Sequence, residues 1–201
     1  MSTTRLVYSR SMPYDSAATR ARLLDAAYDE FVERGLAGAR VDRIASAASA
    51  NKQAIYAYFG SKDALFDAVL DARLQVLADL VPFTPRDLPG YAGTLFDQLD
   101  ADPGLVRLTQ WKALERPDAS AAELAAHLDK ANSLGDARGS TVEAGMDAMM
   151  FALAAAQSWN STAGVIRNPA GDDESARKAR HRAAMVAAVA AATDALLNPA
   201  R

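Results

Sequence analysis

At 201 residues the chain is long enough for one domain or two small ones. Half of its residues are apolar, 46 are alanine and 7% are aromatic. This composition favours packed helices over β-architectures, because alanine has the highest helix propensity. The chain contains no cysteine, which excludes a disulfide scaffold, thiol catalysis and any metal site with cysteine ligands.

The net charge of −3 hides an uneven distribution along the chain. Residues 1–62 contain nine Lys/Arg and six Asp/Glu, which gives +3, whereas residues 63–201 contain 13 and 19, which gives −6. A basic segment in an acidic chain indicates an anionic partner for that segment. There is no apolar run of 18 residues and no signal-peptide pattern, so we expect a soluble, cytoplasmic protein without a membrane segment.

The N-terminal third predicts an arm followed by three short helices. Residues 1–14 contain Pro13 and no apolar periodicity, which is typical of a flexible arm. A first helix is expected from residue 15 or 16 to about 34, with Gly35 as its stop signal. A second is expected at 41–48, then a tight turn at Ser49-Ala50, then a third at 52–58 with Asn51 as its cap.

The rest of the chain also predicts helices only. Ser61 is expected to cap a long helix that runs to about residue 80. Further helices are expected at about 90–100, 104–115, 120–134, 140–161 and 173–197. Gly135 and Gly139 are expected to flank a loop, after which Ser140 and Glu143 have the spacing of a capping box. The predicted fold class is therefore all-α.

Two short helices joined by a tight turn match the pattern of a helix-turn-helix. In this motif one helix enters the major groove of DNA and presents polar or small residues to the bases. The third predicted helix offers such a surface, while Ile55, Tyr58 or Phe59 can face inward. The residues of that surface are Lys52, Gln53, Ala54 and Ala57. Lysine and glutamine reach guanine and adenine edges, and alanine can touch a thymine methyl group.

An ordered set of short motifs spans residues 23–70. The motifs are Leu24-x-x-Ala27-x-x-x-Phe31 with Gly35, Val41-x-x-Ile44-Ala45, Lys52 with Ile55-Tyr56-x-Tyr58-Phe59, and Ser61-Lys62-x-x-Leu65. With these spacings the segment resembles the DNA-binding domain of TetR-family transcriptional regulators. The remainder resembles the family in architecture only, as a divergent set of helices.

The resemblance implies an N-terminal three-helix DNA-binding domain at 15–62, followed by a helical ligand-binding and dimerisation domain at 63–201. It implies a homodimer on a palindromic double-stranded DNA operator, acting most often as a repressor and released by a small apolar or aromatic effector. The last two predicted helices are rich in alanine on more than one face, which suits an intermolecular four-helix bundle.

Four further residues are candidates for contacts to the DNA backbone. The resemblance implies a phosphate contact for the hydroxyl of Tyr56, although the ring could also be a packed aromatic. Lys62 lies in the first turn of a predicted helix, where the helix dipole disfavours a cation, and a bound phosphate would offset this unfavourable interaction. The alternative is a solvated lysine. Arg40 and Arg43 are the other two candidates.

The sequence departs from the family pattern at three positions. Ser49 and Ala50 stand where the family usually has glycine and valine, and Arg40 stands where a Ser or Thr often caps the second helix. Serine adopts a tight turn at a conformational cost. The loss of a cap lowers helix stability by about 1 kcal/mol, but it places a cation where a phosphate could lie.

The largest concentration of bulky, adaptable apolar side chains lies in the second part. Trp111, Met146, Met149, Met150 and Trp159 could form a pocket wall for an apolar or aromatic effector, or a plain helical core. His127 and His181 form no metal motif, and we find no catalytic constellation, so we expect no metal, no cofactor and no enzyme. The alternative function is a helical small-molecule-binding protein that does not use DNA.

Overall fold

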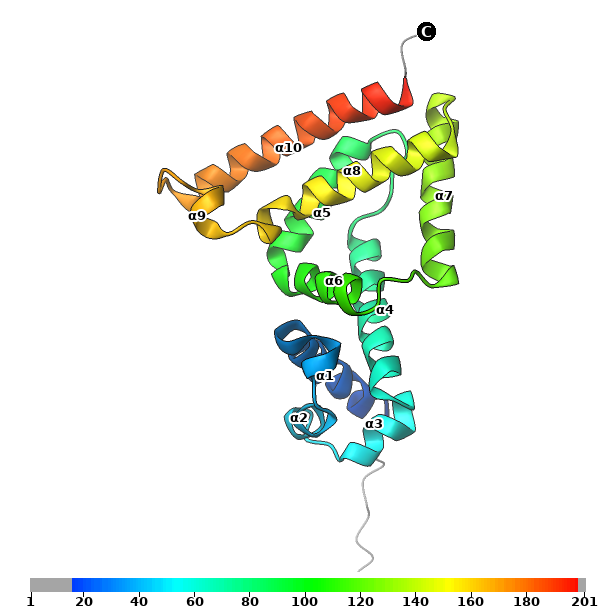
Figure 1. Cartoon of the computed structure of the whole chain (residues 1–201), viewed down its shortest axis with the longest axis vertical. Coiled ribbons are helices and arrows are strands. Elements are labelled where there is room, and N and C mark those ends of the chain that lie inside the picture. The colour runs from blue at the N-terminus through cyan, green and yellow to red at the C-terminus, as the bar shows by residue number, and fades with distance from the viewer. Residues whose placement is uncertain (1–15, 199–201) are drawn as a thin grey trace, which may run out of the picture.

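The computed structural model describes residues 16–198, and every regular element in that range is an α-helix, as predicted. Figure 1 shows two groups of helices connected by the long helix α4. The helices are α1 (Ser16–Gly38), α2 (Val41–Ala47), α3 (Lys52–Phe59), α4 (Lys62–Leu80), α5 (Leu88–Ala101), α6 (Pro103–Glu115), α7 (Ala121–Arg138), α8 (Val142–Ser161), α9 (Gly164–Arg167) and α10 (Glu174–Leu197).

The N-terminal group is built on an apolar core to which each of α1–α4 contributes. Ala27 and Phe31 lie one helical turn apart on α1 and are fully buried. The rings of Phe31 and Phe66 meet edge to face, with centroids 5.0 Å apart. Ile44 of α2 and Ile55 of α3 are also fully buried, and burial of such a side chain stabilises the fold by roughly 1.5–3 kcal/mol. This core holds α2 and α3 against α1 and α4.

Side-chain caps begin α3 and α4 at the expected residues. The Asn51 side chain accepts a hydrogen bond from the Ala54 amide at 2.8 Å, and Ser61 Oγ accepts one from the Ala64 amide at 3.0 Å. Each cap satisfies an amide group that has no partner within its helix. In contrast, α2 has Arg40 as its N-cap residue and no side-chain cap, as the departure from the family pattern predicts.

The C-terminal group is organised around α8. α7 and α8 form a hairpin in which their backbones approach closely: a Cβ on Gly145 would lie 2.1 Å from the carbonyl oxygen of Ala131. Beyond this contact α8 packs against α5 and α10, and Met149 and Trp159 are buried there. The N-terminal half of α7 extends away from α8, with Leu124 and Leu128 exposed (Figure 1).

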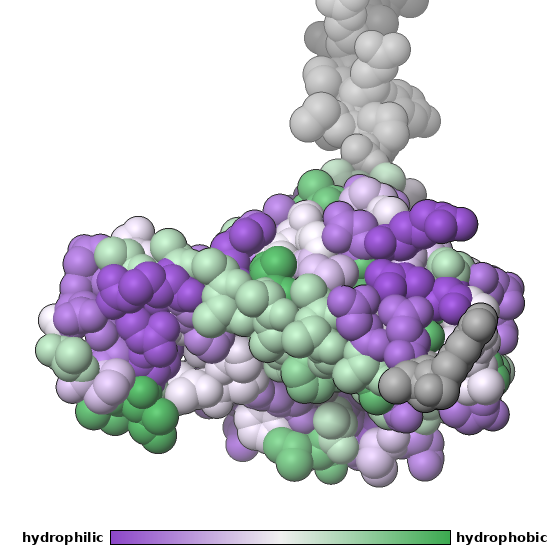
Figure 2. Space-filling model, turned by 90° about the horizontal axis from the view of Figure 1, so that it is seen from above, coloured by the Kyte–Doolittle hydropathy of each residue, from purple (hydrophilic) through white to green (hydrophobic). Residues whose placement is uncertain are grey.

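The outward face of α10 is lined with small apolar side chains. Its exposed alanines are Ala176, Ala179, Ala183, Ala184, Ala187, Ala188, Ala191 and Ala195. On α8, Met150 and Phe151 are 52% and 43% exposed. Figure 2, which views the molecule from the α10 end, shows a band of hydrophobic surface between hydrophilic patches.

Several element boundaries differ from the sequence-based expectation. The predicted break at Gly135 is wrong, because α7 continues through it to Arg138 and ends at Gly139, which is left-handed. The cap of α8 is Thr141 rather than Ser140. The short helix α9 was not expected, and α1 continues past a kink at Gly35 to Gly38. The expected arm at 1–14 and the candidate cap at residue 15 lie outside the described residues.

Among residues 16–198, none of the helices combines the length and the apolar character needed to cross a membrane. Within the same range, no group of three or more His, Cys, Asp or Glu side chains could hold a metal ion. His127 and His181 lie on different helices, α7 and α10.

Candidate nucleic-acid interface

The helix α3 projects at the end of the molecule opposite α10 (Figure 1). Its inner side is anchored by Ile55, which is fully buried, and by the half-buried rings of Tyr58 and Phe59. Its outer side carries four exposed residues, whereas Ala54, expected on this surface, is half-buried and packs against the apolar core. The exposed residues are Lys52, Gln53, Tyr56 and Ala57. α3 therefore presents a surface of small and polar groups on a rigid support.

The turn before α3 sets the angle at which this surface projects. Ser49 adopts φ 50°, a left-handed conformation that few non-glycine residues adopt. The Ala50 amide donates a hydrogen bond to the carbonyl oxygen of Ala45 at 2.9 Å, which closes the turn. Serine thus makes the tight turn that glycine usually makes in the family that the sequence resembles, and it does so in a strained conformation.

Lys52 is paired with an acid that the sequence analysis did not single out. Its ammonium group lies 3.1 Å from the carboxylate of Asp42, in the first turn of α2. Both side chains are exposed, and exposed ion pairs of this kind contribute about 0–1 kcal/mol. The ammonium group can therefore leave Asp42 for a base edge or a phosphate at little energetic cost.

Tyr56 is 47% exposed, so its ring is not part of the packed core of the N-terminal group. It lies on α3 one turn after Lys52, on the same outward side. The hydroxyl group is therefore available to an external partner. Of the two interpretations left open by the sequence, exposure favours a contact role over a packing role.

Arg43 is engaged inside the N-terminal group. Its guanidinium donates hydrogen bonds to the Glu30 carboxylate, with Nε 2.8 Å from Oε1, and to the carbonyl oxygen of Gly38 at 2.9 Å. Burial raises the pKa of Glu30, but the hydrogen bonds from Arg43 and from the Arg40 amide outweigh it, so the pKa lies below its ordinary value. The Glu30–Arg43 pair therefore ties α1 to α2.

Glu30 is a residue that sequence reasoning missed. It lies beside the apolar positions Ala27 and Phe31 of α1 and is nearly fully buried. An acid in that position needs a cation or amide partner, because an unpaired buried charge is strongly destabilising. An acid next to the apolar core positions of a predicted helix is therefore a sequence signal from which a cationic partner such as Arg43 could have been predicted for Glu30.

Lys62 also has internal partners. Its Nζ donates hydrogen bonds to the carbonyl oxygens of Leu36 at 2.7 Å and Ala39 at 3.2 Å. An ammonium group has three donors, so one remains for an external acceptor. Lys62 is half-buried, and it is not the solvated lysine that the sequence left as an alternative.

The five candidate effector-site residues do not line a common cavity among the described residues. Met149 and Trp159 are buried in the core, Met146 is half-buried, and Met150 is exposed on α8. Trp111 packs against α1 and donates its Nε1–H to the carbonyl oxygen of Val32 at 3.2 Å. It borders only a small hollow, of about 120 Å³, on α6.

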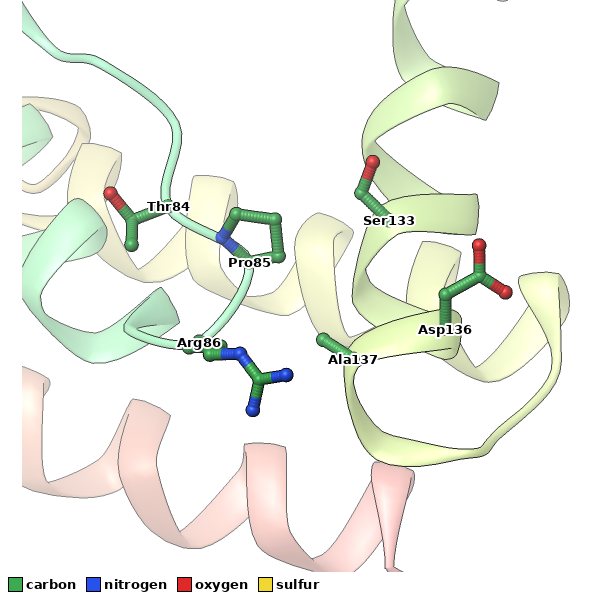
Figure 3. A pocket seen from close by; sticks show the side chains of 6 residues that line it. All are labelled: Thr84, Pro85, Arg86, Ser133, Asp136 and Ala137. Carbon is green, nitrogen blue, oxygen red and sulfur yellow. The ribbon is translucent and has the colours of Figure 1, made fainter.

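A larger hollow lies elsewhere, between α7 and the loop that follows α4. It is an open groove of about 510 Å³ (Figure 3). Its lining residues are Thr84, Pro85, Arg86, Ser133, Asp136 and Ala137. Sequence reasoning did not find these residues, because they come from two segments about 50 residues apart and carry no motif.

Two family models together match most of the chain. Residues 23–69 match the model of bacterial regulatory proteins of the tetR family, and residues 87–190 match the model of the tetracyclin repressor-like C-terminal domain. The first match contains the α3 surface, and the second contains the helices α5–α9 and most of α10.

Two curated relatives are regulators of transcription. The HTH-type transcriptional repressor SCO4008 of Streptomyces coelicolor is 48% identical over 101 residues, which are 50% of this chain and 53% of that protein. The HTH-type transcriptional repressor NicS of Pseudomonas putida is 43% identical over 53 residues, which are 26% of this chain and 25% of that protein. The chain thus spans about half the length of the first relative and a quarter of the second.

Solved structures extend the similarity over the whole fold. The transcriptional regulator SCO4942 of Streptomyces coelicolor is 35% identical and has a TM-score of 0.73, over 85% of this chain and 96% of that chain. The fatty acid degradation regulator FadR of Bacillus halodurans shares the fold, with 19% identity and a TM-score of 0.62 over 96% of this chain and 99% of that chain. Because both parts of the chain match and SCO4942 is similar over nearly its full length, the chain belongs to the TetR family of bacterial regulatory proteins.

Proposed function

We propose that the protein is a ligand-responsive, DNA-binding transcriptional regulator rather than an enzyme, and that it acts as a repressor in the cytoplasm. The observation that carries this proposal is the outward surface of α3, which is polar and small on a helix anchored by Ile55. A helix of this kind fits the major groove of B-DNA. We assign DNA binding to residues 15–62, and ligand binding and dimerisation to residues 63–201.

The exposed side chains divide into base-reading and backbone-contacting groups. Lys52 and Gln53 read guanine and adenine edges, and Ala54 and Ala57 allow close approach to thymine methyl groups. Backbone phosphates are contacted by Tyr56 and Arg40, and by the third donor of Lys62. Arg43 is bound to Glu30 and contributes to the phosphate contacts only through its remaining exposed donors.

Dimerisation supplies the two recognition helices that a palindromic operator needs. A second copy of the chain would cover an apolar face made of the exposed alanines of α10 and of Met150 and Phe151 of α8. Figure 2 shows a hydrophobic band on the surface seen from the α10 end. Small residues allow helices to approach closely, which favours a four-helix bundle of α8 and α10 from each subunit. The two α3 helices then lie about 34–36 Å apart, one turn of DNA.

A small apolar or aromatic effector would bind in the second domain. The support is a set of large apolar side chains that face solvent on α4 and α7, among them Leu80, Leu124 and Leu128. A ligand that covers such groups favours the conformer in which they are buried. Since α4 begins at Lys62 beside α3 and reaches the second domain, it can carry that change to the DNA-binding surface.

The test is selection of duplexes from a random pool by the full-length protein, followed by titration of variants against the selected duplex. Gln53→Ala is expected to relax sequence preference at one base pair by about 1–3 kcal/mol. Arg40→Ala is expected to weaken binding to all duplexes and to reduce the slope of affinity against salt by about one unit. Failure of the protein to select any duplex at low salt would overturn the proposal and leave the small-molecule-binding alternative.

A further inference from the structure

The turn from Gly35 to Ala39 connects α1 to α2 and has an unusual backbone. Gly35 adopts φ 67° and ψ 179°, which interrupts α1 before its last residues. The amide groups of Leu36 and Ala37 therefore start a new helical turn, as the first amides of a helix do, and lack acceptors within α1. Because Leu36 is buried, its amide needs another partner.

That partner comes from the second domain. Glu115, the last residue of α6, accepts hydrogen bonds on Oε2 from the Leu36 amide at 2.6 Å and from the Ala37 amide at 3.2 Å. A carboxylate in this position acts as the N-terminal cap of the turn, supplied from a residue 79 positions away in the chain. It also satisfies the preference of a helix N-terminus for negative charge.

The second end of α6 is attached to α1 as well. The hydroxyl of Tyr28 donates a hydrogen bond to Asp102 Oδ1 at 2.5 Å, directly before α6 begins. Between the two ends, Trp111 lies against the turn, and a Cβ on Gly35 would come within 2.8 Å of its ring. α6 is thus held to α1 at both ends and along its length (Figure 1).

The opposite side of the same turn is bound by the DNA-binding elements. Lys62, the first residue of α4, donates to the carbonyl oxygens of Leu36 and Ala39. Arg43 of α2 donates to the carbonyl oxygen of Gly38. One short turn therefore joins the last residue of α6 to α2 and to the start of α4.

We infer that Glu115 is a positioning residue for DNA binding: it caps the turn at residues 35–39 and thereby fixes α2 and the start of α4 relative to α6. The inference rests on the proposed function, and it identifies a connection between the domains that does not pass along α4. A shift of α6 carries the turn with it, because separation would leave two amide groups and a half-buried carboxylate unpaired.

The test compares Glu115→Ala with Glu115→Gln and with the control Glu33→Ala, all in the full-length protein. Glu33 is an exposed carboxylate on α1 that pairs with Arg34, so its removal changes the charge of the same region without touching the turn. Glutamine keeps one acceptor oxygen for the two amides and should rescue part of the effect. Circular dichroism verifies that each variant is folded.

Two measurements report on the variants. Amide hydrogen exchange measured by NMR is expected to accelerate at Leu36 and Ala37 in Glu115→Ala. Affinity is measured for the duplex that the wild-type protein selects, and for the same duplex with one base pair inserted between its half-sites. In Glu115→Ala the affinity for the first duplex is expected to fall about tenfold, and the preference over the second duplex to shrink, because the DNA-binding helices are no longer held at one separation. Glu33→Ala should keep the wild-type exchange rates and spacing preference.

Faster exchange with unchanged affinity and unchanged spacing preference would make Glu115 a structural cap only and would overturn the inference. Unchanged exchange at both amides would overturn it at the first step. If the wild-type protein selects no duplex, the proposed function fails and the positioning role fails with it, whereas the exchange result still shows whether the cap exists.

Discussion

At the scale of single residues, Gly35 is the position where backbone conformation and packing both demand glycine. Its φ of 67° is left-handed, and a Cβ would lie 2.8 Å from both the Trp111 ring and a carboxylate oxygen of Glu115. Gly35 was expected to stop the first helix, which agrees with the kink observed there. The close approach of α6 was not visible in the sequence, because it involves residues almost 80 positions away.

Gly35→Ala is expected to destabilise the protein more than Gly139→Ala. Gly139 has nearly the same φ, 66°, but a Cβ there meets nothing within 4 Å, so its substitution carries only the conformational cost, about 1–2 kcal/mol. Overpacking at Gly35 should add about 1–3 kcal/mol. Chemical denaturation of both variants measures the difference, and equal losses would show that α6 does not press on the turn.

His181 provides a pH-dependent contribution to stability. It is packed between the rings of Trp159, at 5.2 Å, and Phe96, at 6.0 Å, and lies 3.0 Å from Ser158 Oγ. Burial, and then the positive charge of Arg177, lower the pKa of His181 below its ordinary value. The folded protein therefore favours the neutral imidazole.

A depressed histidine pKa stabilises the fold at neutral pH, and this contribution is lost as pH falls below the ordinary histidine value of about 6.5 towards the lower pKa of the folded state. His181→Phe keeps a ring in this position but cannot bind a proton. We expect the melting temperature of the wild-type protein to fall more steeply than that of the variant between pH 7 and pH 5. If the two melting temperatures fall in parallel with pH, His181 does not contribute to the acid sensitivity of the protein.

At the scale of elements, the turn between α2 and α3 carries local strain in the middle of the helix-turn-helix. Ser49 is exposed and left-handed, and the resembling family usually has glycine in that turn. The starts of α3 and α4 were predicted correctly, because their signals are local: the side chains of Asn51 and Ser61 each accept a hydrogen bond from the amide three residues further along the chain. The break predicted at Gly135 was wrong, because α7 ends only at the left-handed Gly139, where the Ser140 amide donates a hydrogen bond back to the carbonyl oxygen of Gly135.

Ser49→Gly is expected to stabilise the N-terminal group by about 0.5–1 kcal/mol, since the left-handed penalty exceeds the added freedom of the unfolded chain. Ser46→Gly is the matched control. Ser46 lies on the exposed side of α2 in helical conformation, so glycine there should destabilise by up to about 1 kcal/mol. Urea unfolding of the two variants should therefore give shifts of opposite sign, and shifts of the same sign would contradict the strain at Ser49.

At the scale of the whole molecule, the apolar face of α8 and α10 lies at the opposite end from α3 (Figure 1). A dimer formed through this face would hold the two recognition helices at a separation set by everything between them, including α6 and its cap on the turn at residues 35–39. Assembly and DNA binding are therefore expected to fail together when the face is disrupted.

Ala187→Glu tests this arrangement. Ala187 is exposed on α10, so the substitution leaves the fold of one subunit intact but places a charge in the proposed interface. Light scattering should report a monomer, and affinity for the selected duplex should fall by roughly a hundredfold or more, as the second recognition helix is lost. Ala113→Glu, on the exposed side of α6, should remain dimeric. A dimeric Ala187→Glu protein would require a different interface.

The sequence by itself determined the helical class, most helix boundaries and the caps of α3 and α4, because these follow from interactions within a few residues. It also predicted that Ile55 faces inward, as the structure has it, whereas Ala54, expected on the outward surface, is half-buried against the core. Only the tertiary structure decided the partners of the charged groups. Lys62, Arg43 and Lys52 were all candidate DNA contacts, the first two for the backbone and the third for the bases, yet each has acceptors within the chain, 5 to 26 residues away. Charge attraction is not specific to one partner, so the packing of the helices chose the acid or carbonyl that each cation meets.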